Sequence, residues 1–198
     1  MSDVIEALAG VTNVLLAAPS MGGSREVCSR LLTGDLDQPN VLFVSYTRGP
    51  ADCVDQWAGT GAAATLAGIT VGDTAAELDR EDVETASVST PSDLTGLGIE
   101  IGRVLSAWEG PTAVCFDSVT TMLQYVDFET AYEFLHTVTG QFHAADARAH
   151  FHIDPQAHET TTIDGITSLF DARVDAGEDL TVRTRDVVGE RVSRPADG

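Results

Sequence analysis

Short apolar runs recur along this chain, and polar or glycine-rich stretches separate them. The runs are rich in β-branched and aromatic residues, and most lack the alternation of a half-exposed strand. Strands of this kind are buried on both faces, which is typical of parallel sheets. The predicted strands are residues 13–18, 41–46, 68–71, 86–89, 112–116 and 148–153.

Helical spacing occupies the intervals between several of these runs. Apolar residues repeat at intervals of three and four from Leu94 to Trp108, and again within 128–144. Residues 162–170 predict a shorter helix, which a short strand at 172–174 follows. Alternating strands and helices predict an α/β fold with three layers, in which a mostly parallel sheet carries helices on both faces.

The last part of the chain has a different pattern. Residues 180–185 and 190–194 alternate in polarity around Gly189, which predicts an antiparallel β-hairpin at one edge of the sheet. No repeat or linker divides the chain. We therefore expect one domain over 1–198, with a core at about 13–174 and the hairpin at about 179–194.

The charge balance is strongly acidic. Aspartate and glutamate number 31 against 11 basic residues, all of them arginine, for a net charge of -20. At molar salt the Debye length is only about 3 Å, so this charge keeps the surface hydrated with little self-repulsion. We interpret the chain as a cytoplasmic protein of an organism that keeps molar salt inside its cells. No basic stripe is present for nucleic acid.

The absence of lysine excludes two kinds of chemistry in their usual form, the Walker A phosphate loop and Schiff-base catalysis. No 18-residue apolar run predicts a membrane span, and the acidic start has no basic region typical of a secretion signal. Cys28, Cys53 and Cys115 are scattered. We expect small core residues in a reducing compartment, and not a disulfide or zinc framework.

The loop after the first strand has the placement of a P-loop, between a strand and a helix. Aligned on GxxxxGK[ST], Ala18 and Gly23 are the glycine positions, Ser24 is the lysine position and Arg25 the hydroxyl position. One interpretation is a degenerate anion site at a helix N-terminus. The other is a tight turn with Ser24 as helix cap. The candidate residues are Ser20, Gly22, Gly23, Ser24 and Arg25.

Two further groups of residues are candidates for chemistry. The strand at 112–116 ends in Asp117, which has the position of a Walker B carboxylate and is also suited to capping the next helix. His150 and His152 point to the same side of their strand. With Asp154 they are candidate metal ligands, and the alternative is that they are packed and hydrogen-bonded.

These motifs give the chain a resemblance to RecA-like ATPases of the KaiC-like group, over about 13–174. It looks like a halophilic archaeal branch whose nucleotide motifs have decayed. Besides the changes at Ser24 and Arg25, residues 45–48 contain no carboxylate where active members carry a catalytic glutamate. Lysine, metal and the water-orienting group together drive phosphoryl transfer, so the resemblance predicts no hydrolysis.

The resemblance implies a non-catalytic regulatory or scaffolding protein in signalling or motility control, with protein partners or as a homo-oligomer. It predicts no cofactor beyond residual ATP and Mg²⁺. One alternative is a nucleotide sensor that binds ATP or ADP without turnover. A less favoured one is a metal-dependent hydrolase using the two histidines and Asp154. Arg48 and Trp57 are either a partner-facing patch or an ordinary ion-paired arginine and a core-covering tryptophan.

Overall fold

The computed structural model describes residues 2–19, 24–34, 36–49, 63–72, 83–177 and 180–185. Its strands are β1 (Asn13–Ala17), β2 (Asn40–Ser45), β3 (Thr65–Val71), β4 (Val83–Val88), β5 (Thr112–Asp117), β6 (Ala147–Ile153), β7 (Ala172–Ala176) and β8 (Leu180–Thr184). Its helices are α1 (Ser2–Ala7), α2 (Ser24–Thr33), α4 (Leu94–Ala107), α5 (Val119–Met122), α6 (Phe128–Ala144) and α7 (Thr160–Thr167).

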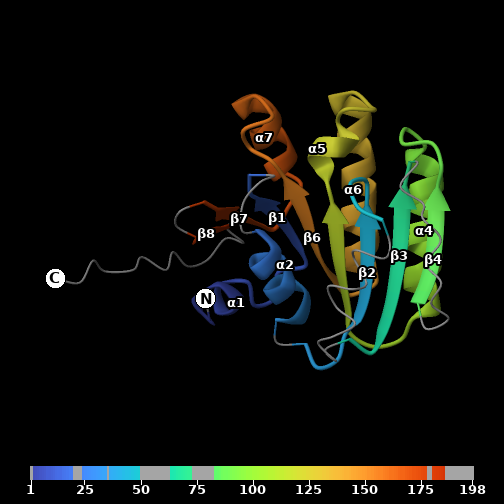
Figure 1. Ribbon diagram of the computed structural model, residues 1–198. Helices are drawn as coiled ribbons and strands as arrows, with labels where there is room; N and C mark the ends of the chain where they lie inside the picture. Colours follow the sequence, from blue (N-terminus) through green and yellow to red (C-terminus); the bar gives the residue numbers. More distant parts are fainter. Residues whose placement is uncertain are drawn as a thin grey trace.

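The described strands form one eight-stranded sheet in the order β4-β3-β2-β5-β6-β1-β7-β8 (Figure 1). Every neighbouring pair from β4 to β7 is parallel, and only β7 and β8 are antiparallel. The predicted α/β class with a mostly parallel sheet is therefore confirmed. Because β1 to β7 run in the same direction, their carboxyl ends share one edge, which is uppermost in Figure 1.

Helices cover both faces of the sheet. On one face α4 and α6 pack over a core that includes Leu97, Leu135 and Phe151, all fully buried (Figure 1). On the other face α1 and α2 cover a smaller core around Leu16 and Leu32. The strands in the middle of the sheet are buried along both faces, which explains their continuous apolar sequences.

Local sequence signals locate the ends of the two longest helices. Asp93 accepts a hydrogen bond from the Gly96 amide at 2.8 Å and begins α4. Asp127 accepts one from the Thr130 amide at 2.8 Å and begins α6. Each carboxylate satisfies a backbone donor that the helix leaves unpaired. The prediction of a helix over 128–144 is confirmed at both ends.

The C-terminal hairpin was predicted at one edge of the sheet, and the strand over its first half, β8, lies at an edge. β8 pairs with β7, and Val174 lies opposite Val182. The second predicted strand, 190–194, lies outside the described residues. Two short helices, α1 and α5, were not predicted, because neither is long enough to show a periodic pattern. None of the described helices has the length and apolar character needed to cross a membrane.

Candidate functional site

The carboxyl edge of the sheet brings Asp117 together with two residues of the loop after β2, Thr47 and Arg48. Asp117 Oδ2 accepts hydrogen bonds from Thr47 Oγ1 at 2.9 Å and from Arg48 Nε at 3.1 Å. Arg48 Nη2 lies 3.0 Å from the same oxygen and completes an ion pair. The two charged side chains are 27% and 17% exposed, so this pair is largely withdrawn from water.

The backbone after β2 is held in place for this contact. Ser45 and Asp117 are register partners on neighbouring strands, and the Tyr46 amide donates to the Asp117 carbonyl at 2.6 Å. The buried Ser45 Oγ accepts hydrogen bonds from the Thr47 and Arg48 amides, at 3.3 and 2.9 Å. The segment from Ser45 to Arg48 therefore folds over the end of β5, and directs the guanidinium to the carboxylate.

Asp117 does not cap the next helix, contrary to one of the two sequence-based interpretations. The N-cap of α5 is Ser118, whose Oγ accepts a hydrogen bond from the Thr121 amide at 3.1 Å. Asp117 is consequently left to its contacts with Thr47 and Arg48. The placement expected for a Walker B carboxylate, at the end of a buried strand, is present, but the carboxylate already has a cationic partner.

The loop predicted to bind an anion lies mostly outside the described residues. This applies to Ser20, Gly22 and Gly23, and also to Trp57 of the predicted surface patch. Ser24 and Arg25 are the first two residues of α2, so the helix begins where the P-loop alignment placed it. Their side chains are not described, and their roles remain predictions.

Asp154 does not join the two histidines with which it was grouped. Its amide donates to Thr120 Oγ1 at 2.8 Å, and its Oδ1 accepts from the Gln156 amide at 2.9 Å. The same Thr120 hydroxyl lies 3.0 Å from His158 Nε2. Thr120 thus ties α5 to the turn after β6, and this group of polar contacts is better explained as a structural connection at the carboxyl edge.

The two histidines instead meet two cysteines, in a second cluster beneath α2. Cys28 comes from α2, Cys115 from β5, and His150 and His152 from β6. One ligand atom from each of the four residues lies within 4.8 Å of the others. Cys28 Sγ is 3.7 Å from Cys115 Sγ and 3.2 Å from His150 Nε2.

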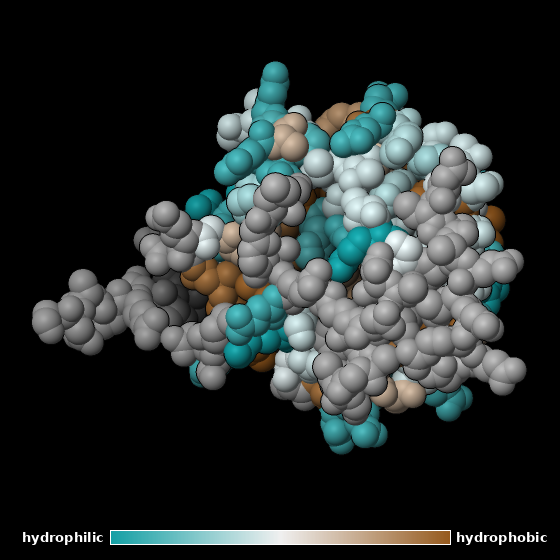
Figure 2. Space-filling view, in the orientation of Figure 1, coloured by the Kyte–Doolittle hydropathy of each residue, from teal (hydrophilic) through white to brown (hydrophobic). Residues whose placement is uncertain are grey.

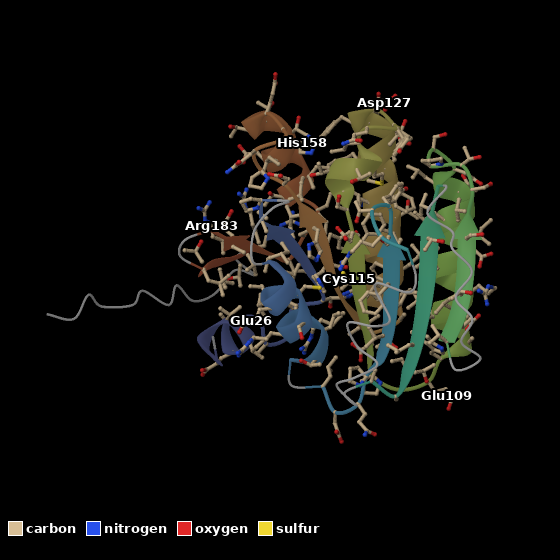
Figure 3. The ribbon with its side chains drawn as sticks, viewed as in Figure 1. Glu26, Glu109, Cys115, Asp127, His158 and Arg183 are labelled. Carbon is tan, nitrogen blue, oxygen red and sulfur yellow. The ribbon has the colours of Figure 1, made fainter. Side chains whose placement is uncertain are left out.

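Strand geometry explains why these residues converge. Cys115 and His150 are register partners on the adjacent strands β5 and β6. His150 and His152 lie on the face toward α2, since the intervening Phe151 belongs to the core on the opposite face. Cys115 of β5 lies near the centre of the molecule (Figure 3).

Interactions within the cluster shift the pKa values of the two thiols in opposite directions. The hydrogen bond with Cys115 lowers the pKa of Cys28, and the histidines add to this against the opposing effect of burial. The same hydrogen bond, together with burial, raises the pKa of Cys115. Burial disfavours the charged form of His152, but the neighbouring Cys28 and Asp117 outweigh it and raise its pKa. The cluster therefore favours a thiolate at Cys28.

The expectation that the cysteines are small core residues is confirmed for Cys28 and Cys115. Cys28 and Cys115 are buried, at 2% and 1% exposure, but they are neighbours in space across 87 positions of sequence. The only indication of this cluster in the local sequence was the His-x-His pair of β6. Cys53 lies outside the described residues.

Comparisons with known proteins identify a family and a fold. Residues 11–176 match DUF7504, a family of unknown function. No curated protein matches the chain. A protein of Pyrococcus horikoshii OT3, solved in a structural study of Project ID PH0250, is similar in fold with a TM-score of 0.63 and 10% identity. The similarity covers 92% of this chain and 91% of that one.

Proposed function

The chain belongs to DUF7504, a family of unknown function, and we propose that it is a non-catalytic regulatory or scaffolding protein that acts by binding other proteins. Its fold is proposed to be a RecA-like domain whose nucleotide site has decayed. We further propose that it works in the cytoplasm of a halophilic archaeon, in signalling or motility control, as the resemblance to KaiC-like proteins suggests.

The ion pair between Arg48 and Asp117 carries this proposal. A carboxylate that positions Mg²⁺ in phosphoryl transfer must offer an oxygen to the metal or to its water. Here Asp117 Oδ2 receives Thr47 Oγ1 and two nitrogens of Arg48, and the guanidinium already neutralises its charge. A metal ion at Asp117 would have to bind beside a guanidinium that already neutralises this carboxylate, and the repulsion between the two cations opposes such binding.

Two features of the sequence support the same conclusion. The chain has no lysine for the β- and γ-phosphates, and the segment 45–48 supplies an arginine where a catalytic glutamate would be needed. What the domain retains is its sheet, its helical layers and their surfaces. Hydrophilic side chains project from the upper edge, with less polar residues among them, as expected for an acidic protein in concentrated salt (Figure 2).

Calorimetric titration of Mg-ATP separates this proposal from the nucleotide-sensor alternative. The wild type, Asp117→Ala and Arg48→Ala are titrated at about 2 M KCl, which screens the acidic surface. We expect no binding by the wild type and no ATP hydrolysis above the buffer rate. Micromolar binding that Asp117→Ala weakens would support the sensor instead, and turnover that Asp117→Ala abolishes would overturn the proposal.

A second experiment tests the partner. The protein is captured with its bound proteins from a high-salt lysate, in parallel with Asp117→Asn, and each preparation is treated with and without Mg-ATP. A scaffold should bind the same partner in all four preparations. Binding that changes with ATP in the wild type alone would indicate a sensor, and a monomer without a partner would contradict both roles.

A further inference from the structure

We propose that Cys28, Cys115, His150 and His152 form a structural binding site for a thiophilic divalent metal, with Zn²⁺ as the best-suited ion. The ligand atoms are the two Sγ atoms and the Nε2 atom of each histidine. This inference is independent of the proposed function, because the cluster lies beneath α2 and shares no residue with the Arg48–Asp117 pair.

The spacing of the donor atoms fits a tetrahedral ion. Zinc–sulfur bonds are about 2.3 Å long, so two thiolates on one tetrahedral zinc are about 3.8 Å apart. The two sulfur atoms here are separated by 3.7 Å. A zinc-bound sulfur and nitrogen are about 3.5 Å apart on the same basis, against 3.2 Å between Cys28 Sγ and His150 Nε2. All four atoms lie within 4.8 Å of one another, so the remaining pairs would have to approach further to surround one ion.

The chemistry of the donors also fits. Two thiolates and two neutral imidazoles are a common ligand set for structural zinc, and their combined charge balances a divalent cation. Such balance matters here because three of the four residues are almost fully buried. Four protein ligands leave no open position, which is typical of a structural site and not of a catalytic one.

An unsatisfied nitrogen provides an independent indication of a ligand. His152 Nε2 is buried and makes no hydrogen bond of normal geometry to the described residues, although Cys28 lies near enough to raise the pKa of the ring. A buried polar atom without a partner costs about 1–3 kcal/mol, so native proteins rarely leave one. The atom belongs to the four-residue cluster. A bound metal would satisfy it.

Two other uses of the thiols fit the geometry less well. A nucleophilic cysteine must reach its substrate, but the exposures of Cys28 and Cys115 are only 2% and 1%. A disulfide would require the two sulfur atoms, which lie 3.7 Å apart as free thiols, to approach to about 2.05 Å, and it would leave His152 Nε2 unsatisfied. A metal would join α2, β5 and β6 at one point, and so fix the helix that follows the glycine-rich loop against the sheet.

Metal content and cobalt substitution test the site. The protein is purified at high salt with thiol reductant and without chelator, then analysed by elemental spectrometry. We expect about one zinc per chain. Co²⁺ added to stripped protein should give intense visible bands of a tetrahedral site and sulfur-to-cobalt charge transfer in the near ultraviolet. Binding should release protons and therefore depend on pH, because the Cys115 thiol and any protonated histidine must lose a proton before they can ligate the metal.

Variants assign the ligands. Cys28→Ser and Cys115→Ser should abolish the sulfur-to-cobalt band or shift it strongly, and His152→Gln should weaken binding at least about tenfold, as for lost metal partners elsewhere. His143→Gln is the matched control, since His143 is exposed in the last turn of α6. It should leave the cobalt spectrum and the affinity unchanged.

If the cysteine variants fail to fold, measurements on the wild type still test whether the site binds a metal. A strong chelator should then lower its melting temperature, and added Zn²⁺ should restore it. The proposal is overturned if the purified protein carries no metal, gives no tetrahedral cobalt spectrum and melts at the same temperature with and without Zn²⁺. Isolation of a Cys28–Cys115 disulfide under the reducing conditions would overturn it as well.

Discussion

Arg48 Nη2 lies 3.0 Å from Asp117 Oδ2, although the two residues are 69 positions apart in the sequence. The contact joins the loop after β2 to the end of β5, at the edge where α/β proteins usually place their ligands. In this chain the edge carries an internal ion pair. That relationship is both the strongest argument against catalysis and a measurable part of the stability.

Removing Arg48 should destabilise the fold. Arg48→Ala leaves a half-buried carboxylate with only Thr47 as its described side-chain partner, and we expect a loss of about 1–3 kcal/mol in the free energy of unfolding. Chemical denaturation at about 2 M KCl measures it. Arg30→Ala is the control, because its pair with Glu26 is exposed and should contribute less than about 0.5 kcal/mol. Equal losses in the two variants would contradict the prediction.

The double variant refines the same measurement. Asp117→Asn alone should also destabilise, while Arg48→Ala combined with Asp117→Asn should lose less than the sum of the two single changes. Such non-additivity is expected for residues in direct contact. Strict additivity would show that the ion pair contributes nothing beyond its separate side chains.

Stability should rise steeply with KCl. A net charge of -20 repels itself at low ionic strength, and salt screens that repulsion once the Debye length falls to a few ångströms. Thermal unfolding followed by circular dichroism from dilute buffer to about 3 M KCl tests this. A melting temperature that is unaffected by salt would remove the argument for a halophilic cytoplasm.

Capping of α6 should make stability depend on pH in the acid range. Hydrogen bonds from the Thr130 amide and hydroxyl lower the pKa of Asp127 below its value in the unfolded chain. The charged cap therefore stabilises the fold above the unfolded pKa of about 3.9, and its contribution is lost as the pH falls through the lower folded pKa. Asp127→Ala should lower the melting temperature at neutral pH.

The pH series distinguishes a charge effect from a helix-propensity effect. The difference between wild type and Asp127→Ala should narrow as the pH falls below about 4, where the wild-type carboxyl becomes protonated. Asp127→Asn keeps an accepting oxygen and is the matched control; its melting temperature should lie between the two. A difference that stays constant with pH would mean that the charge has no part in the cap.

Phe151 should be among the most costly core residues to truncate. It is fully buried and its ring lies 5.1 Å from Phe116, 5.8 Å from Phe142 and 4.9 Å from Phe170 between centroids. Phe151→Ala removes one ring from the centre of this group, and we expect a loss of about 3–5 kcal/mol. The control is Phe128→Ala, because Phe128 is 40% exposed.

Denaturant unfolding measures both phenylalanine variants. A loss at Phe151 no larger than that at Phe128 would mean that the core relaxes around the missing ring. The result also bears on the metal cluster. Phe151 stands between His150 and His152 in β6, and its packing against α6 and its neighbours holds the histidines toward α2.

The sequence by itself determined the layered α/β fold, because buried parallel strands and amphipathic helices leave local patterns in hydrophobicity. The helix over 128–144 could be predicted from its helical spacing of apolar residues. The buried strands β2, β5 and β6 could be predicted from their continuous apolar runs. The absence of lysine likewise excluded a phosphate-binding ammonium without any coordinates. These properties depend on neighbours within a few positions, or on composition alone.

Tertiary structure alone decided which distant side chains meet. Arg48 reaches Asp117 because β2 and β5 are neighbours in the sheet, and Cys28 meets Cys115 because α2 crosses β5 and β6. Neither contact has a local signature, since strand order and helix placement depend on the packing of the whole chain. The same reason explains why Asp154, only two positions from His152, belongs to a different set of contacts.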